Sequence, residues 1–449
     1  MPQRSTCTLL LTLALLGNVF SVPFVEHVYH NYTALVDIMN DLTDLYPQYT
    51  EVYSVGKSVE DRELLVMAIA GTDPDKHIPG RPEVKYVGNM HGNEAVGREL
   101  LLQLIEHYLV GYTDGDADIK QFLDETRVHI LPSMNPDGFE ESDMLDCTSI
   151  KGRFNANGLN LNRNFPDFFE ENTQEIQIET RAIMDWLEDI PFILSANLHG
   201  GALLANYPYD NIEPDKKNAS YCPYHACPDD DTYRNLSLTY SLNHENMYDE
   251  DFNDCEHVRG GNRPGFKDGI TNGCAWYQAI GVMQDYNYIA AGCMEITLEV
   301  SCCKYPNVTE LPTFWDWNRK SLIEYLKQVH KGVKGQVLDE NDDPIVGASV
   351  RVQGRDLPFK TASDGYYWRI LLPGTYTIEV AKEGYQNAQK SVAVSGDLYD
   401  VSLLDFKLEP MTTSTQSNDP SDDGVAVSPS ICLSVIMTSL IILVLKVIP

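Results

Sequence analysis

The stretch Asn89-Met90-His91-Gly92-Asn93-Glu94 follows an apolar run at residues 84–87 and places an imidazole and a carboxylate three positions apart. At this spacing, a turn or the start of a helix brings both side chains to one face. A second isolated histidine, His199, ends the run at residues 191–198, which is typical of a buried strand that opens into a glycine loop. We therefore expect two strand ends to carry His91, Glu94 and His199.

Two histidines and one carboxylate form a donor set that is typical of a catalytic zinc site, because the fourth position is left to water. A structural zinc site would need a fourth protein ligand. A His-x-x-Glu pair alone is weak evidence, since a surface helix can carry two such polar residues without any metal. The hypothesis of one Zn²⁺ per chain, held by His91, Glu94 and His199, therefore depends on the rest of the sequence.

Strand-like and helix-like patterns alternate before Lys331. The strand patterns lie at residues 64–70, 84–87 and 128–132, and the helical patterns lie at residues 96–109 and 176–187. This alternation predicts an α/β domain whose sheet is covered by helices on both faces. Ligands of such sheets bind at strand ends, which is where His91 and His199 fall.

From Gly332 the pattern changes to short strand-like runs that are separated by turns rich in Gly or Asp. Short strands at regular spacing predict a β-sandwich. We therefore expect a main domain at residues 23–330 and a sandwich at residues 331–410. No catalytic constellation occurs in the sandwich sequence, which favours a packing or folding module, and an adhesion role exercised alongside catalysis is the alternative.

The N-terminal residues are typical of a secretory signal peptide. Arg4 precedes an apolar run at residues 9–16 and small residues near 17–21, which predicts a signal at residues 1–22. Of the ten cysteines, Cys7 and Cys432 lie in the terminal segments, and the remaining eight are an even number that predicts disulfides in an oxidising compartment. Predicted N-glycosylation sites lie at Asn31, Asn218, Asn235 and Asn307.

The C-terminal residues resemble an attachment signal for a GPI anchor. A polar spacer at residues 411–430 leads into a hydrophobic tail at residues 431–449, and the candidate attachment region is 417–424. A short membrane-spanning helix is the alternative, although the tail barely reaches the ~20 residues that a bilayer requires. Both interpretations place the protein at the cell surface, on the extracellular side of the plasma membrane.

The formal net charge of −33 is compatible with the attraction of cationic peptides, although most of these charges are expected to form a solvated surface. No basic stripe occurs in the sequence. This absence argues against nucleic acid as a partner.

Six segments carry a resemblance to a known family. They are NMHGNEAVGRE (89–99), PSMNPDGF (132–139), LNLNRNFPD (159–167), ANLHGGA (196–202), GVMQDYNY (281–288) and MEITLEVSCCKYP (294–306). In this order they resemble the zinc metallocarboxypeptidases, and specifically the branch that contains carboxypeptidases N, E, D and M and cleaves basic residues. The resemblance spans residues 25–410. It implies a mixed twisted sheet flanked by helices, followed by a small transthyretin-like β-sandwich.

Residues 294–300 alternate like a strand, so Glu295 and Glu299 lie on one face and the pattern cannot choose between them as a general base. The resemblance selects Glu299, because Tyr277 lies at the matching distance upstream and is similar to the family's mobile tyrosine, which hydrogen-bonds the substrate. The resemblance also pairs Cys302 with Cys255 and Cys303 with Cys147. Among the other cysteines, a local bridge between Cys222 and Cys227 would leave Cys274 and Cys293 as partners, although the sequence does not determine the connectivity.

The resemblance also assigns the substrate contacts. Asn162 and Arg163 match the pair that binds the terminal carboxylate, a role that suits the planar fork of arginine. Arg153 matches the arginine that stabilises the oxyanion. Asp210 and Gln284 fall where the basic-specific members place polar residues of the pocket, and a buried carboxylate would pair with Lys or Arg.

These assignments together predict an extracellular enzyme that removes C-terminal Arg or Lys from peptides and proteins. Its reaction would use metal-activated water with a glutamate as general base. A catalytically silent binding glycoprotein is the alternative. Such a protein would be expected to lack a metal ligand or the base, whereas every one of these residues is present here.

Overall fold

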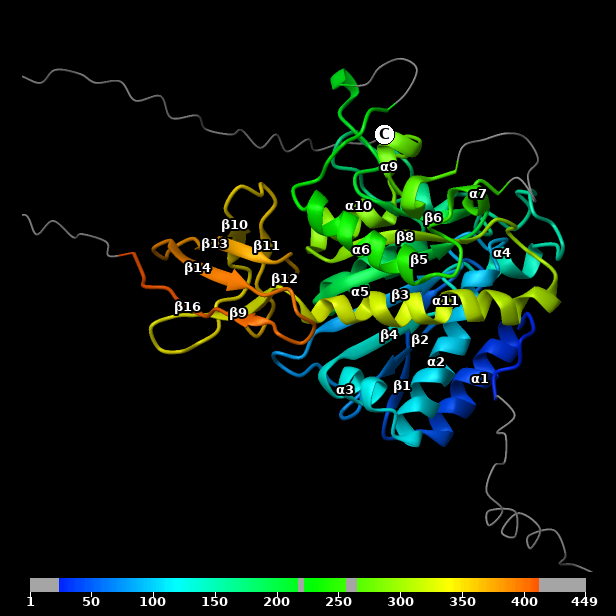
Figure 1. Ribbon diagram of the computed structural model, residues 1–449, viewed down its shortest axis with the longest axis horizontal. Helices are drawn as coiled ribbons and strands as arrows, with labels where there is room; N and C mark the ends of the chain where they lie inside the picture. Colours follow the sequence, from blue (N-terminus) through cyan, green and yellow to red (C-terminus); the bar gives the residue numbers. More distant parts are fainter. Residues whose placement is uncertain (1–23, 217–221, 256–264, 412–449) are drawn as a thin grey trace, which may run out of the picture. The chain divides into compact units, whose positions relative to one another are not determined.

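The computed structural model describes residues 24–216, 222–255 and 265–411, and its first part is built around one eight-stranded sheet (Figure 1). Across the sheet the strands lie in the order β1-β2-β4-β3-β5-β8-β6-β7. Their bounds are Thr50–Lys57 (β1), Glu63–Ile69 (β2), Glu83–Gly88 (β3), Arg127–Leu131 (β4), Phe192–His199 (β5), Ala202–Tyr207 (β6), Ile270–Asn272 (β7) and Met294–Ser301 (β8). Strands β4, β3, β5 and β8 are parallel, whereas β1 pairs antiparallel with β2, β2 with β4, and β6 with β8. The sheet is therefore mixed, which confirms the expected fold class.

Helices cover both faces of this sheet. Successive residues of a strand point to opposite faces, so each strand packs against both helical layers. On one face, Tyr86 and Ile296 belong to an apolar cluster that includes residues of α1, α2, α3, α6 and α11. On the other face, Val66 and Val87 pack with residues of α5 and α10. The helix bounds are Tyr32–Leu45 (α1), Val96–Asp114 (α2), Ala117–Glu125 (α3), Ile178–Asp189 (α5), Asp230–Asn243 (α6), Met283–Ala291 (α10) and Leu311–Leu326 (α11).

Shorter helices connect these elements. They are α4 (Pro136–Glu141), α7 (Glu250–Asn253) and α9 (Gly273–Trp276), and the 3-10 helices η1 (Leu161–Arg163), η2 (Pro214–Lys216), η3 (Lys267–Gly269), η4 (Val308–Glu310) and η5 (Lys327–His330).

The register of three parallel strands determines what their ends bring together. Gly88 of β3 lies opposite Leu198 of β5, and His199 of β5 lies opposite Glu299 of β8. Parallel strands present their C-terminal ends at one edge of a sheet, where ligands of α/β proteins bind. Side chains that follow β3 therefore meet those that end β5 and β8.

Residues 333–408 form a β-sandwich of two small sheets with its own apolar core. One sheet has the order β11-β10-β13-β14, and the other has the order β12-β9-β15, with β16 also paired to β9. The strand bounds are Val333–Leu338 (β9), Ser349–Val352 (β10), Phe359–Lys360 (β11), Tyr366–Arg369 (β12), Gly374–Ala381 (β13), Ala388–Val394 (β14), Ser402–Leu403 (β15) and Phe406–Lys407 (β16). The described residues up to Pro410 form one compact unit.

The cysteine pairing differs in part from the expectation. Cys147 pairs with Cys303 and Cys255 with Cys302, as the resemblance implies. The local bridge is wrong, because Cys222 pairs with Cys274. These two residues share a small cluster with Ile212, whereas Cys227 belongs to the main core.

The even count of eight cysteines was therefore misleading. Cys227 and Cys293 are buried free thiols rather than disulfide partners. Cys293 lies in the apolar cluster that holds α5 and α10, and Cys227 lies in the cluster on the opposite face of the sheet. The two thiols belong to different apolar clusters and form no disulfide, so an even number of cysteines did not imply complete pairing.

The terminal predictions fall mostly outside the described residues. The signal peptide, all but the first residue of the polar spacer, and the hydrophobic tail lie at residues 1–23 and 412–449, and Asn218 also lies outside. Asn31, Asn235 and Asn307 are exposed. Within the described part of the chain, no helix is both long and apolar enough to cross a membrane.

An ion pair lies inside the sheet, on the face that α5 and α10 cover. The Lys85 ammonium is fully buried and donates to Ser195 Oγ at 2.8 Å, to Asn287 Oδ1 at 2.8 Å and to Glu295 Oε2 at 3.0 Å. Glu295 is therefore engaged with a cation in the interior, whereas Glu299 lies at the strand end. The two glutamates that alternation could not separate thus occupy different environments.

Replacement of Lys85 by Ala should destabilise the protein by about 3–5 kcal/mol, because it leaves the Glu295 carboxylate buried without its cation. Denaturant unfolding with the disulfides intact would measure the change. Lys151→Ala is the control, since Lys151 pairs with Asp143 on the exposed surface and should contribute less than about 1 kcal/mol. Equal effects of the two substitutions would contradict the structural role of the buried pair.

Candidate metal centre and substrate pocket

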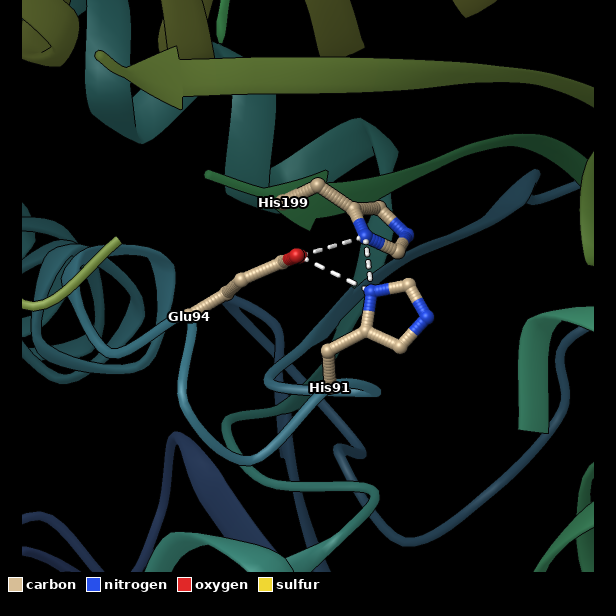
Figure 2. Close-up of side chains that lie close together, drawn as sticks. All are labelled: His91, Glu94 and His199. Atoms are coloured by element: carbon tan, nitrogen blue, oxygen red, sulfur yellow. Dashed lines mark hydrogen bonds and ion pairs between the residues drawn. The ribbon is translucent and has the colours of Figure 1, made fainter. Parts of the chain in front are cut away.

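Three buried side chains converge beyond the ends of β3 and β5 (Figure 2). His91 Nδ1 lies 3.0 Å from Glu94 Oε2 and 3.0 Å from His199 Nδ1, and His199 Nδ1 lies 2.8 Å from the same glutamate oxygen. His91 and Glu94 come from a tight turn, in which the Glu94 amide donates to the His91 carbonyl at 3.0 Å. The structure thus brings together all three residues that the sequence proposed as metal ligands.

The loop that carries His91 and Glu94 is held from both sides. Asn89 has a positive φ of 55°, and its buried side-chain amide donates to the carbonyls of His91 and Gly92 at 3.1 and 2.9 Å. A Cβ on Gly92 would lie 2.1 Å from the carbonyl carbon of Gly138, so only glycine fits there. These contacts fix the loop against α4 and point both donors toward His199.

The protonation of His91 suits a metal ligand. Asn160 Oδ1 accepts from the Asn162 amide at 3.0 Å and lies 2.9 Å from His91 Nε2. This network assigns the ring proton to Nε2 and leaves a lone pair on Nδ1, facing the other two donors. Burial, the largest influence, lowers the pKa of His91 to about 3, so the imidazole is neutral.

The donor set fits Zn²⁺. Zn–N bonds of about 2.0–2.1 Å in a tetrahedral site place two nitrogens roughly 3.3 Å apart. The two Nδ1 atoms of the structure lie 3.0 Å apart and share one carboxylate oxygen. Three acceptors in contact repel one another unless a cation joins them, and two imidazoles with one carboxylate leave a fourth position open.

Two positively charged side chains lie beside the second carboxylate oxygen of Glu94, Oε1. Arg153 Nη1 donates to Glu94 Oε1 at 2.6 Å, and Lys304 Nζ lies 3.6 Å from the same atom. Lys304 was not proposed from the sequence. Its position follows from the Cys147–Cys303 disulfide, which ties the loop before Arg153 to the segment that follows β8.

Glu299 lies in the same cavity, at the end of β8. Its Oε2 atom is buried and has no hydrogen-bond partner among the described residues. Burial and, after it, the charge of Glu94 raise the pKa of Glu299 to about 7. A carboxylate with this pKa can exchange a proton near neutral pH.

The predicted carboxylate-binding pair lies on η1. Asn162 Oδ1 accepts from the Met283 amide at 2.9 Å, and Asn162 Nδ2 lies 3.5 Å from His199 Nε2. The Arg163 guanidinium lies 5.9 Å from the centre of the Tyr277 ring, and Tyr277 is 46% exposed. The pair therefore lies beside the metal centre, with an accessible aromatic ring over the arginine.

The cavity wall also contains Asp210, which lies among other buried hydrogen-bond acceptors. Buried Asp210 accepts from Asn206 Nδ2 at 2.9 Å and from Gln284 Nε2, and its own amide donates to Asp285 Oδ2 at 2.9 Å. Burial raises the pKa of Asp210 to about 6. Asn206 Oδ1, Gln284 Oε1 and Asp285 Oδ1 are buried without a partner within the described chain.

Several members of this network were not predicted from the sequence. Asn206 and Asp285 hold Asp210, Asn160 orients His91, and Lys304 faces Glu94. Asn160 and Asp285 lie inside the quoted motifs LNLNRNFPD and GVMQDYNY, so their motif context was a usable signal. Lys304 likewise lies inside the motif MEITLEVSCCKYP, whereas Asn206 had no such functional signal, because only the pairing of β6 with β8 brings it to the cavity.

One cavity contains the three metal-donor residues together with Glu299 and Asp210. Its lining residues are His91, Glu94, Arg153, Asn162, Arg163, His199, Asn206, Asp210, Trp276, Tyr277, Ala279, Val282, Thr297 and Glu299. Gln284 does not line it, but it supports Asp210 from behind. A Cβ on Gly273 would lie 2.1 Å from Asp210 Oδ1, so this glycine leaves space for the carboxylate.

Comparisons with known proteins agree with this geometry. The model of the zinc carboxypeptidase family matches residues 35–321, and that of the carboxypeptidase regulatory-like domain matches residues 332–409. Carboxypeptidase M of Mus musculus is 47% identical over 391 residues, with 86% of each chain covered. The carboxypeptidase N catalytic chain of Rattus norvegicus is 40% identical over 422 residues, with 89% of this chain and 90% of that relative covered.

Other relatives are longer or more distant. Carboxypeptidase D of Homo sapiens is 43% identical over 403 residues, which cover 90% of this chain but 28% of the human protein. The crystal structure of carboxypeptidase A from Helicoverpa armigera has a TM-score of 0.50 at 16% identity, and the match covers 67% of this chain and 73% of that one. This likeness shows a shared fold.

Removal of one donor should abolish tight zinc binding. We expect the parental protein to hold one Zn²⁺ per chain and His199→Ala to bind it more than about 100-fold more weakly, since even the loss of a residue that only orients a ligand weakens binding 10–100-fold. Metal analysis after dialysis against a chelator would measure this. His27→Ala, outside the centre, is the control, and full retention of zinc by His199→Ala would refute the assignment.

Proposed function

Because the chain belongs to the zinc carboxypeptidase family, we propose that it is a carboxypeptidase that removes C-terminal arginine or lysine from peptides and proteins. The observation that carries this proposal is the single cavity that contains Glu299, the buried acid Asp210 and the donor triad. The donor triad consists of His91, Glu94 and His199. Loss of the last residue requires recognition of the chain end, recognition of its side chain, and hydrolysis of the bond between them.

Recognition of the chain end falls to Arg163 and Asn162. The planar guanidinium can bind the terminal carboxylate with two parallel hydrogen bonds, and this charge distinguishes a chain end from an internal peptide bond. Asn162 is held by the Met283 amide, so its side-chain NH₂ group is oriented before substrate arrives. Tyr277 can close over the bound residue, since its ring is half exposed beside Arg163.

Recognition of the side chain falls to Asp210. A guanidinium or ammonium group would pair with the Asp210 carboxylate and donate to Asn206 Oδ1, which belongs to a cavity-lining residue and lacks a partner among the described residues. A leucine side chain would leave the Asp210 carboxylate desolvated and without a cation, which disfavours binding. The same buried acceptors therefore attract basic residues and reject apolar ones.

Hydrolysis requires a nucleophile and a proton carrier. A bound Zn²⁺ supplies a Lewis acid that lowers the pKa of water and polarises a carbonyl group. Glu299 accepts the proton of the attacking water and returns it to the leaving amine, which its pKa near neutrality allows. Arg153, at the edge of the cavity, can donate to the scissile carbonyl oxygen as negative charge develops on it.

We extend the proposal to the location of the enzyme. Three disulfides within the described residues favour an oxidising compartment, and Asn31, Asn235 and Asn307 are accessible to glycosylation. An extracellular enzyme held at the plasma membrane by a GPI anchor agrees with these features and with the expected signals at both ends. Its substrates would be extracellular peptides and proteins.

The role of Glu299 has a defined pH dependence. The base must be ionised, so kcat/KM should be high above the pKa of Glu299 and should fall as the pH decreases through that pKa. The pKa of Glu299 is about 7 without a bound cation, and a bound cation would lower it because the positive charge stabilises the carboxylate. Glu299→Gln should keep its zinc but lose at least about 100-fold in kcat. Hydrolysis of a blocked dipeptide ending in Arg, with metal analysis, tests both statements, and near-parental turnover would exclude Glu299 as the base.

Asp210 should determine selectivity. In Asp210→Asn we expect the ratio of kcat/KM for Arg-ending over Leu-ending dipeptides to fall by at least about 30-fold, because a buried charge pair loses one partner. Asp215→Asn is the matched control, since Asp215 is exposed and does not line the cavity. A parental enzyme that prefers leucine, or an unchanged ratio in Asp210→Asn, would contradict the pocket assignment.

The anchor is testable on intact cells. A phospholipase specific for phosphatidylinositol should release the enzyme from the cell surface, because it cleaves the lipid from a GPI-linked protein. Surface immunostaining before and after treatment would measure the release. Retention of the protein at the surface would favour the short membrane-spanning helix.

A further inference from the structure

The β-sandwich contacts the C-terminal end of α10, the helix that carries Gln284 and Asp285. A Cβ on Gly292, which ends α10 with a positive φ, would lie 2.9 Å from Cγ of Phe359 in β11. The Phe359 ring also meets the Tyr288 ring edge to face, with 6.0 Å between their centres. The guanidinium of Arg369, a residue of the sandwich, lies 3.9 Å from the centre of the Phe359 ring. Phe359 is therefore packed between an arginine of the sandwich and the end of α10.

A buried carboxylate connects the same elements by hydrogen bonds. Asp229, which precedes α6, accepts from Arg369 Nη2 at 2.8 and 2.9 Å and from Arg355 Nη1 at 2.7 Å. The Tyr288 hydroxyl donates to Asp229 Oδ2 at 2.6 Å. Asp229 and Tyr288 are fully buried, and Arg369 is 1% exposed. Two arginines of the sandwich are thus joined through one carboxylate to one tyrosine of α10.

The first turn of α10 holds the substrate pocket. The Met283 amide donates to Asn162, the Gln284 side chain donates to Asp210, and Asp285 accepts from the Asp210 amide. Tyr288 lies four residues after Gln284, or about 6 Å along the helix axis at a rise of 1.5 Å per residue. Tyr288 and the first turn belong to the same nine-residue helix, so the position of Tyr288 can be transmitted to Gln284 and Asp285 through the helix backbone.

We propose that the β-sandwich positions the substrate pocket: Arg355 and Arg369 act through Asp229 and Tyr288 to hold α10 where Gln284 and Asp285 orient Asp210. This inference rests on the proposed carboxypeptidase function and deepens it. The four residues are positioning residues, because none of them lines the cavity. His91 and Glu94 come from the turn after β3, His199 from β5 and Glu299 from β8, so neither the metal donors nor the base lies on α10.

The link predicts a specific kinetic pattern. A displaced α10 would disturb Asp210, which selects the side chain, while Glu299 and the metal ligands keep their places. KM for a basic substrate should therefore rise while kcat changes little. A sandwich that contributes stability alone would lower the unfolding temperature without any change in selectivity.

Tyr288→Phe is the decisive variant, because it removes one hydroxyl and keeps the ring. The loss of one hydrogen bond to a charged partner should lower the Arg-over-Leu ratio of kcat/KM about three- to tenfold, mainly through KM for the Arg substrate. Zinc content should equal that of the parent. Tyr367→Phe is the matched control, since its hydroxyl bonds Leu404 O within the sandwich at 2.6 Å and does not touch α10.

Arg369→Met tests the same link from the sandwich side and should lower the ratio in the same direction, whereas Asp231→Asn, which loses the exposed partner of Arg355, should not. An unchanged ratio in a Tyr288→Phe enzyme that still hydrolyses the Arg substrate would overturn the positioning role. Equal losses in Tyr288→Phe and Tyr367→Phe would also overturn it, by showing general loosening. If the parental enzyme cleaves neither substrate, the proposed function itself fails, and the inference falls with it.

Discussion

The site depends on the parallel pairing of β3, β5 and β8. Their hydrogen-bonded register places Gly88 beside Leu198 and His199 beside Glu299, so residues far apart in sequence end at one edge of the sheet. A shift of one residue would turn His199 and Glu299 to the opposite face, because side chains alternate along a strand. The metal centre and the base are therefore consequences of strand register, supported by the tight turn that carries His91 and Glu94.

The buried polar groups of this sheet differ in how completely they are hydrogen-bonded. Both carboxylate oxygens of Glu295 accept hydrogen bonds, Oε2 from Lys85 and Ser195 and Oε1 from Asn197. Around Asp210 and Glu299 the hydrogen bonding is incomplete, because buried acceptor atoms lack partners within the described residues. An unpaired buried acceptor is destabilising, and at a cavity wall a ligand can supply the missing donor. This contrast on one face of the sheet separates the structural carboxylate from those that we assign to substrate and catalysis.

The β-sandwich has no catalytic constellation of its own, yet it is not a detached module. Phe359 and Ile370 of the sandwich belong to the apolar cluster of the large sheet, and Arg355 and Arg369 share Asp229 with α10. A buried polar network whose members are paired rigidifies its surroundings and specifies one arrangement. The packing module expected from sequence can thus affect selectivity through the helix that supports the pocket.

The sequence by itself determined the features that local patterns encode. Alternation of strand and helix predicted a sheet with helices on both faces, and the spacing of His91 and Glu94 with His199 predicted a three-donor centre. The resemblance named Arg163, Asp210 and Glu299, and the structure places all three in one cavity. Alternation along β8 put Glu295 and Glu299 on one face but could not say which of them lies at the open end.

Only the tertiary structure decided the contacts between distant segments. It paired Cys222 with Cys274 and left Cys227 free, and it brought Asn206, Lys304 and the link from Arg369 to Tyr288 into the architecture of the site. Such contacts have no period or spacing that a sequence can display, because they arise from strand register and from the packing of separate clusters. Motifs and periodic patterns can be recognised in the sequence itself. The partner of a buried charge or thiol, in contrast, depends on which surfaces the fold brings together.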